Sequence, residues 1–205
     1  MANRIMSIWD DRYDREEYVF GTEPNAFLKS CAPLLETGQT VLAIADGEGR
    51  NGVWLARQGL KVTGFDASPV GLDKARRLAA RNGVEVDYRL ASVEEWNWDA
   101  ESFDVVAAIF IQFAEPPLRK LIFEGMIRTL KPGGLLLLQG YTPRQLEYGT
   151  GGPRAVENLY TRPLLEEAFA SLRILRLDEH DSEVDEGPGH SGMSALIDLV
   201  ARKEA

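Results

Sequence analysis

The sequence has little of what disulfide-bonded, metal-binding or membrane-spanning proteins need. Cys31 is the one cysteine and only 2 histidines accompany it in 205 residues, so an internal disulfide or a zinc site built from these residues is excluded. The longest apolar run, Val105–Ile111, is far shorter than the roughly 20 residues of a membrane-spanning helix. The first residues also lack the apolar core of a secretion signal. We therefore expect a cytoplasmic protein without a metal cofactor.

Basic residues are in deficit as well. The chain has 23 Lys and Arg against 32 Asp and Glu, a net charge of -9. Such a balance gives no overall attraction for phosphate backbones or anionic lipids, so we expect a small-molecule partner, with no nucleic acid and no membrane. With 44% hydrophobic and 27% charged residues, the length predicts one globular domain over residues 1–205, as a monomer or a homodimer.

Short apolar runs alternate with segments that carry helix signals. The runs have no strict alternation, which is typical of strands buried on both faces of a sheet. They are Val41–Ala45, Val62–Phe65, Val84–Leu90, Val105–Ile111 and Leu135–Leu138. Ser68-Pro69 and Pro116-Pro117 begin two of the intervening helices, and Gly83 and Pro132 end them. This pattern predicts an α/β fold with an open parallel sheet and right-handed crossovers.

The two ends of the chain differ from this middle part. Residues 1–38 form an amphipathic, aromatic-rich segment that we expect to be helical and to act as a lid on a catalytic core at 39–205. Thr22 or Asn25 is a candidate cap for its second helix. Near the other end, Arg173–Leu177 and Ala195–Arg202 look like strands. Because the linker between them is too short for a helical crossover, we expect an antiparallel hairpin.

The sharpest motif is the glycine-rich turn Gly47-Glu48-Gly49-Arg50-Asn51-Gly52, which follows the first apolar run and begins a helix. Glycines there permit a tight turn and a close approach of backbone to a ligand. Asp66 ends the second run, where a carboxylate can accept both hydroxyls of a ribose. The loop therefore predicts a nucleoside ligand, and by itself it leaves a dinucleotide and S-adenosylmethionine as alternatives.

A resemblance to a known family separates these alternatives. The segment Leu130-Lys131-Pro132-Gly133-Gly134-Leu135 and the terminal hairpin resemble the class I S-adenosylmethionine-dependent methyltransferases. That family implies a Rossmann-like three-layer sandwich with a seven-stranded, mostly parallel sheet in the order 3-2-1-4-5-7-6, the last strand antiparallel. More narrowly, Trp9–Pro24, Gly49–Asn51 and Leu199–Lys203 resemble the tellurite-resistance and thiopurine methyltransferase branch, which methylates sulfur, selenium or tellurium centres on small molecules.

The resemblance also implies a cofactor site for S-adenosyl-L-methionine, with S-adenosyl-L-homocysteine as product. Its expected residues are Tyr18, Phe20, Ala45, Gly47, Gly49, Asn51, Asp66, Ala67, Ala91, Ser92, Val93 and Ile109. The glycines would line the methionine part, Asp66 would bind the ribose, Ser92 would contact the adenine and Ile109 would face the sulfonium. The family has an acidic residue where Ala43 stands and a glycine where Ala45 stands, so the amino group needs another partner: Asp46, Glu48 or a backbone carbonyl.

On the acceptor side, three residues are candidates for a catalytic or substrate-binding role. His190 precedes the last strand, Arg119 could pair with an anionic substrate, and Tyr141 follows the fifth strand. A soft acceptor such as a thiolate needs no general base. His180 lies in an acidic run, and we expect it on the surface. Two other functions remain as alternatives: a dinucleotide-binding oxidoreductase, and a non-catalytic domain that binds S-adenosylmethionine.

Overall fold

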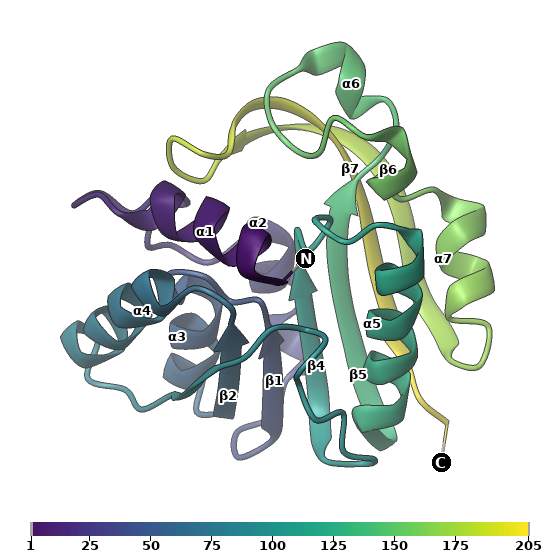
Figure 1. The fold of residues 1–205 in the computed structure, drawn as a ribbon. Helices are drawn as coiled ribbons and strands as arrows, with labels where there is room; N and C mark the ends of the chain where they lie inside the picture. Colours follow the sequence, from purple (N-terminus) through teal and green to yellow (C-terminus); the bar gives the residue numbers. More distant parts are fainter. Residues whose placement is uncertain (1, 205) are drawn as a thin grey trace. The chain divides into compact units, whose positions relative to one another are not determined.

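A computed structural model describes residues 2–204, with side chains described from residue 8 (Figure 1). Seven strands form one sheet in the order β3-β2-β1-β4-β5-β7-β6, which confirms the predicted fold. The strands are β1 (Thr40–Ile44), β2 (Lys61–Asp66), β3 (Asp87–Leu90), β4 (Phe103–Ile109), β5 (Leu130–Tyr141), β6 (Arg173–Asp185) and β7 (Ser191–Arg202). Within the described part of the chain, no helix combines the length and apolar character needed to cross a membrane.

The residues fall into two compact units, which we describe separately. The first unit comprises Met1–Trp96 and the short segment Glu186–Gly189, and the second comprises Asn97–Asp185 and His190–Ala205. The prediction of a single domain, with residues 1–38 as a lid, stays a prediction.

The first unit contains three parallel strands, with β2 between β1 and β3. Its helices are α1 (Ala2–Tyr13), α2 (Ala26–Ser30), η1 (Ala32–Leu34), α3 (Arg50–Arg57) and α4 (Pro69–Arg81). Ser68 caps α4 as predicted, because its side chain accepts a hydrogen bond from Gly71 N at 3.0 Å. β3 is shorter than its apolar run. Val84 N is bonded to the carbonyl of Ala79 and so completes the end of α4.

The N-terminal segment is less helical than predicted. α1 ends at Tyr13, and regular helix returns only at Ala26, where Asn25 provides the predicted cap by accepting from Leu28 N at 2.9 Å. Between them, the backbone makes contacts with side chains of the body. The carbonyls of Arg15 and Glu17 accept hydrogen bonds from Lys74 Nζ, so they are not available for a helical ladder.

The second unit pairs β4 with β5 in parallel, and β5 with β7 and β7 with β6 in antiparallel fashion. Its helices are α5 (Pro116–Thr129), α6 (Gln145–Tyr148), η2 (Val156–Asn158) and α7 (Arg162–Ala168). Figure 1 shows α5 and α7 side by side next to β5 and β6. The aromatic rings of Phe123 and Phe169, one from α5 and one just after α7, pack with centroids 4.8 Å apart.

The terminal hairpin is longer than predicted. β6 and β7 pair from Arg173↔Arg202 to Asp185↔Ser191, so most of the expected linker is strand. An edge strand that exposes one face to solvent tolerates charged residues at alternate positions. The acidic run was therefore predicted as a linker although it belongs to β6, because residues at alternate positions of this strand face solvent. The antiparallel hairpin itself is confirmed.

Candidate functional site

The turn between β1 and α3 is built from residues in the left-handed backbone region. Ala45, Gly47 and Gly49 have φ values of 48°, 55° and 89°. Ala45 stands where the resembling family has glycine, and its positive φ gives the physical reason for that glycine. Gly49 N bonds to the carbonyl of Asp46 at 2.9 Å and closes the turn. The first turn of α3 thus begins directly beside the end of β1.

Packing within the protein explains the glycine at position 49. A Cβ atom there would lie 2.5 Å from Tyr88 Oη and 2.7 Å from Ala75 Cβ. At Gly47, a Cβ atom would lie 2.6 Å from Tyr13 Oη. At Gly49 the structure shows a close approach of α4 and β3. The sequence suggested that these glycines let a ligand approach, and this stays a prediction.

Asp66 connects the two loops that follow β1 and β2. Its Oδ2 accepts from Gly47 N at 2.9 Å, and its Oδ1 accepts from Ser68 N at 2.8 Å. Burial raises the pKa of this carboxyl to about 6, although hydrogen bonds from the amides of Ser68, Gly47 and Ala67 favour the ionised form. A carboxylate has about four acceptor positions. Asp66 is therefore fixed at the carboxyl end of β2 and still has acceptor capacity.

Two acidic residues considered for the cofactor's amino group make contacts inside the protein. Asp46 accepts from Gly52 N at 3.2 Å and from Tyr88 Oη at 3.2 Å, and burial raises its pKa to about 7. Glu48 lies 2.5 Å from Lys74 Nζ, and its other oxygen accepts from Val19 N at 2.7 Å. These contacts hold both carboxylates to neighbouring protein groups.

The Glu48–Lys74 pair fastens the N-terminal segment to the body. Lys74 Nζ also donates to the carbonyls of Tyr13, Arg15 and Glu17, at 3.3, 2.9 and 2.6 Å. We call this group of residues the Lys74 clamp. No local motif predicts it, because its members meet only when the chain folds back on itself.

Tyr18 and Phe20, two predicted cofactor residues, have contacts of their own in this unit. Tyr18 Oη donates to the carbonyl of Lys74 at 3.0 Å, and its ring packs against the apolar cluster around α4. The ring of Phe20 lies 6.3 Å from those of both Trp9 and Tyr13, with the guanidinium of Arg12 4.9 Å away. Tyr18 therefore joins the N-terminal segment to α4, and Phe20 packs within the segment; their contact with a cofactor stays a prediction.

α1 lies against the same two loops that Asp66 connects. Tyr13 Oη reaches Gly47, and the hydroxyl of Ser68 donates to the carboxylate of Asp10 at 2.5 Å. Burial, reinforced by the charge of Asp66, raises the pKa of Tyr13. Sequence reasoning missed both side chains. The available signal was the spacing of Asp10 and Tyr13, which places them on one face of a helix.

A second polar network lies at the start of α3. Asn51 Oδ1 accepts from Asn25 N at 3.0 Å, and Arg50 forms an ion pair of 2.7 Å with Glu186 at the tip of the hairpin. Glu186 Oε1 also accepts from Ala26 N at 3.0 Å. Sequence reasoning missed the Arg50–Glu186 pair, whose members are 136 positions apart.

The residues after β3 include the expected contacts to adenine. Ala91 N bonds to the carbonyl of Asp66 at 3.1 Å, which brings the end of β3 beside the end of β2. Ser92 donates its hydroxyl to Glu95 at 3.0 Å and accepts from Glu95 N at 3.2 Å. This reciprocal arrangement is typical of a helix cap. Val93 is buried, and Ala67, after β2, is half-buried.

In the second unit, two of the predicted residues meet around one aromatic ring. Ile109 ends β4, and the next residue, Phe110, has a φ of 56°. The ring of Phe110 lies 4.7 Å from that of Tyr141 and 4.5 Å from the imidazole of His190, which is buried. Arg119 is apart from this group and donates to the backbone carbonyl of Glu157.

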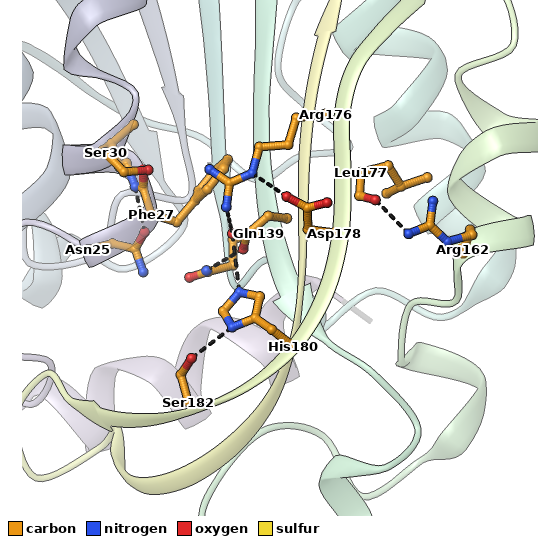
Figure 2. Close-up of polar contacts among 12 residues, drawn as sticks. Asn25, Phe27, Ser30, Gln139, Arg162, Arg176, Leu177, Asp178, His180 and Ser182 are labelled. Carbon is orange, nitrogen blue, oxygen red and sulfur yellow. Dashed lines mark hydrogen bonds and ion pairs between the residues drawn. The ribbon is translucent and has the colours of Figure 1, made fainter.

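His180 is half-buried, with its side chain 35% exposed, and both of its ring nitrogens have partners. Its Nε2 lies 3.2 Å from the buried carboxylate of Asp198, and its Nδ1 lies 2.7 Å from Ser182 Oγ. Asp198 also accepts from Gln139 Nε2 at 2.6 Å and from Arg176 at 2.9 Å. Figure 2 shows the side chains of Gln139, Arg176 and His180 close together. The side chains share one sheet face because β5, β6 and β7 are in register here.

Comparison with known proteins gives these observations a context. Residues 41–134, which include the glycine turn and Asp66, match the family model of a methyltransferase domain. The chain is 33% identical over 109 residues to a ubiquinone biosynthesis O-methyltransferase of Methylocella silvestris, covering 51% of this chain and 41% of that protein. It is 36% identical over 100 residues to the enzyme of the same name from Paramagnetospirillum magneticum, covering 49% and 39%. The aligned region thus spans less than half of either relative.

Solved structures agree on the fold. A structure described for the conversion of a disulfide bond into a thioacetal group during echinomycin biosynthesis has a TM-score of 0.80 at 18% identity, covering 98% of this chain and 92% of that chain. TehB from Haemophilus influenzae has a TM-score of 0.71 at 17% identity, covering 97% and 67%. Over residues 41–134 the chain is therefore similar to a methyltransferase domain, and its fold is the Rossmann-like α/β fold of these solved structures.

Proposed function

We propose that the protein transfers a methyl group from S-adenosylmethionine to a small-molecule acceptor. The observation that carries the proposal is Asp66, which lies at the carboxyl end of β2, is joined to the glycine turn through Gly47 N, and belongs to the segment that matches a methyltransferase domain. In open α/β sheets, ligands bind at the carboxyl ends of the strands. Asp66 would accept the ribose hydroxyls and the turn from Ala45 to Gly49 would lie along the methionine part.

The cofactor would supply an electrophilic methyl group, so the protein's task is alignment and exclusion of water. In this proposal, Asn51 lies beside the methionine part and Ala67, Ala91, Ser92 and Val93 surround the adenine. Because Asp10 and Tyr13 contact the loops after β2 and β1, and the Lys74 clamp holds the backbone that follows α1, α1 would cover the bound cofactor. The clamp thereby fits the lid role that we expect of the N-terminal segment.

For the acceptor, we propose a soft nucleophile: a thiol, or a selenium or tellurium species. Such a group arrives as an anion and needs no general base. The comparison structure whose description concerns the conversion of a disulfide supports sulfur chemistry, and the TehB likeness supports the tellurite-resistance branch. Tyr141 and His190 would contribute to the acceptor wall with Phe110, and Ile109 would face the sulfonium.

An oxygen acceptor is the second candidate. The two relatives from Methylocella and Paramagnetospirillum are named O-methyltransferases. A hydroxyl acceptor calls for a base, and the His180–Asp198 pair has the geometry of an imidazole oriented by a carboxylate. This candidate predicts that His180→Gln lowers kcat by 10²–10⁴-fold, whereas a soft acceptor predicts a small change.

Binding of S-adenosylmethionine and NAD, measured side by side by calorimetry, tests the cofactor assignment. We expect S-adenosylmethionine to bind, and Asp66→Ala to weaken this binding by about 1.5–3 kcal/mol through the loss of two charge-assisted hydrogen bonds. Asp73→Ala is the control, because that side chain is 71% exposed. A preference for NAD, or equal affinities in wild type and Asp66→Ala, contradicts the assignment. Binding without turnover over a panel of thiols, selenols and phenols would favour a non-catalytic domain.

The pH dependence of kcat/KM distinguishes the two acceptor classes. With a soft acceptor, the profile should follow the pKa of the acceptor and move when a thiol of different acidity is used. His190→Ala should then reduce the rate about tenfold or less. A profile that is the same with every acceptor, and that changes in His180→Gln or His190→Ala, would show a histidine base.

A further inference from the structure

The side-chain amide of Asn158 has an oxygen that the protein leaves without a hydrogen bond. Asn158 ends η2 and is 8% exposed, and its Oδ1 is buried. None of the residues that the structure describes donates to this oxygen. A buried polar atom without a partner is unfavourable. The position of Oδ1 therefore indicates a place for a donor that a ligand provides.

Two other buried side-chain amides of the second unit use both of their ends within the protein. Gln112 accepts from Tyr141 N through Oε1 at 2.6 Å and donates through Nε2 to the carbonyl of Tyr141 at 2.9 Å. Gln145 accepts from Ala195 N at 2.8 Å and donates to the loop that follows α6 at 3.0 Å. Asn158 differs from both residues, although it too is buried.

The backbone around Asn158 is fixed at the carboxyl ends of β4 and β5. Gln112, three residues after β4, donates to the carbonyl of Asn158 at 3.1 Å and to that of Tyr141, the last residue of β5. Tyr160 N donates to the same Tyr141 carbonyl at 2.9 Å. Because β4 and β5 are parallel, these ends lie at one edge of the sheet, where open α/β sheets bind ligands. The buried oxygen therefore belongs to a segment beside the expected acceptor site.

The neighbours of Asn158 favour an organic ligand over an inorganic anion. Leu159 packs with Tyr141 in an apolar cluster against which Phe110 lies. Such a surface suits the carbon skeleton of a small molecule. An amide oxygen only accepts, so its partner must be an O–H or N–H group. A hydrogen chalcogenide anion has neither of these groups and no carbon skeleton.

We propose that Asn158 determines acceptor specificity, with its Oδ1 accepting a hydrogen bond from a hydroxyl or amino group of an organic thiol or selenol. This inference rests on the proposed function, in which the acceptor is a small soft nucleophile. The thiolate sulfur forms a bond to the methyl carbon while the bond from that carbon to the cofactor's sulfur breaks, and its electron pair stays on the cofactor's sulfur. The hydroxyl or amino group keeps its proton. An acceptor without that group leaves Oδ1 unpaired, so the site discriminates against it.

The test compares thiols that differ in one group. Hydroxythiophenol and methylthiophenol, as meta and para isomers, are methylated with S-adenosylmethionine at a pH above the pKa of each thiol. The hydroxyl and methyl groups are similar in size, and only the hydroxyl donates. In at least one pair, we expect the wild type to prefer the hydroxyl compound by about 10- to 100-fold in kcat/KM. Asn158→Leu should reduce this preference to about twofold or less and leave the rate of the methyl compound unchanged.

Three further variants make the result independent of how well leucine is tolerated. Asn158→Ala should lose the preference in the same way, and Asn158→Asp should keep it, because a carboxylate is also an acceptor. Asn97→Leu is the control and should keep it too, since Asn97 is exposed.

Equal rates within both pairs in the wild type, or a preference that persists in Asn158→Leu and Asn158→Ala, overturns the inference. If hydrogen sulfide or hydrogen selenide is methylated and neither hydroxythiophenol is, the inference fails and the proposed function stands. If none of these acceptors is methylated, both fail.

Discussion

Replacing Lys74 by methionine tests whether the Lys74 clamp holds the N-terminal segment in place. Lys74 Nζ lies 2.5 Å from Glu48 Oε1, and the two side chains are 4% and 2% exposed. Methionine fills the space of the lysine stem with an apolar chain but leaves the carboxylate of Glu48 buried without a counter-charge. Removal of one partner of a buried ion pair costs about 3–5 kcal/mol. We expect the free energy of unfolding of Lys74→Met to fall by this amount.

The double variant Lys74→Met/Glu48→Leu separates the unpaired charge from the lost hydrogen bonds. Replacing a whole buried pair by apolar residues is often close to neutral. Some cost remains, because the carbonyls of Arg15 and Glu17 lose their donor and Val19 N loses its acceptor, at about 1 kcal/mol each. The double variant should therefore be at least as stable as Lys74→Met, although it carries one substitution more.

Urea unfolding followed by circular dichroism at pH 7 measures these free energies, and hydrogen exchange measures the protection of amides 13–20. Lys120→Met is the control, because Lys120 is 78% exposed and lies 3.9 Å from Glu124. We expect a change of about 1 kcal/mol or less there. The reasoning is refuted if Lys74→Met costs no more than this control, or if the costs of the two single substitutions simply add in the double variant.

Three further predictions concern other buried groups. The pKa of Asp66 is raised to about 6 from an ordinary value of about 3.9. The contribution of Asp66 to the free energy of unfolding, measured with urea, should therefore decrease as the pH rises from about 4 through 6. The affinity for S-adenosylhomocysteine should rise over the same pH range in the wild type and should not change with pH in Asp66→Asn. Gly49→Ala should cost about 1–3 kcal/mol more than Gly83→Ala, because both residues have positive φ and only Gly49 has atoms within 3 Å of the added Cβ. Asp198→Ala should lower the free energy of unfolding by about 3–5 kcal/mol, whereas the same change at the exposed Asp178 should cost less than about 1 kcal/mol.

Local features of the fold were predictable from the sequence. The caps at Asn25 and Ser68 form as neighbouring residues dictate, because a cap depends on the side chain and on an amide two or three positions later. The glycine turn and the buried strands were likewise readable from residue order and apolar runs. The length of β6 was not, because its alternating polar residues look like a solvated loop.

For the candidate site, the sequence predicted in which elements the residues lie, but not all of their hydrogen-bond partners. The sequence placed Asp66 at the end of β2, and the structure adds its contacts with Gly47 N and Ser68 N. Ser92 was expected to contact adenine, yet its hydroxyl is bonded to Glu95. A hydroxyl has several local partners available, and the sequence alone does not decide among them.

Residue order is enough to predict the strand–helix alternation, the glycine turn and the carboxylate at the end of β2, since these follow from interactions between residues close in the chain. Tertiary structure alone decided the Lys74 clamp, the Arg50–Glu186 pair and the donors around Asp198. Each joins segments that are distant in sequence, the members of the Arg50–Glu186 pair being 136 positions apart. A charged side chain carries no local sign of its partner, because the partner is set by packing. Burial then makes the pairing obligatory, since an unpaired charge in the interior is too unfavourable to persist.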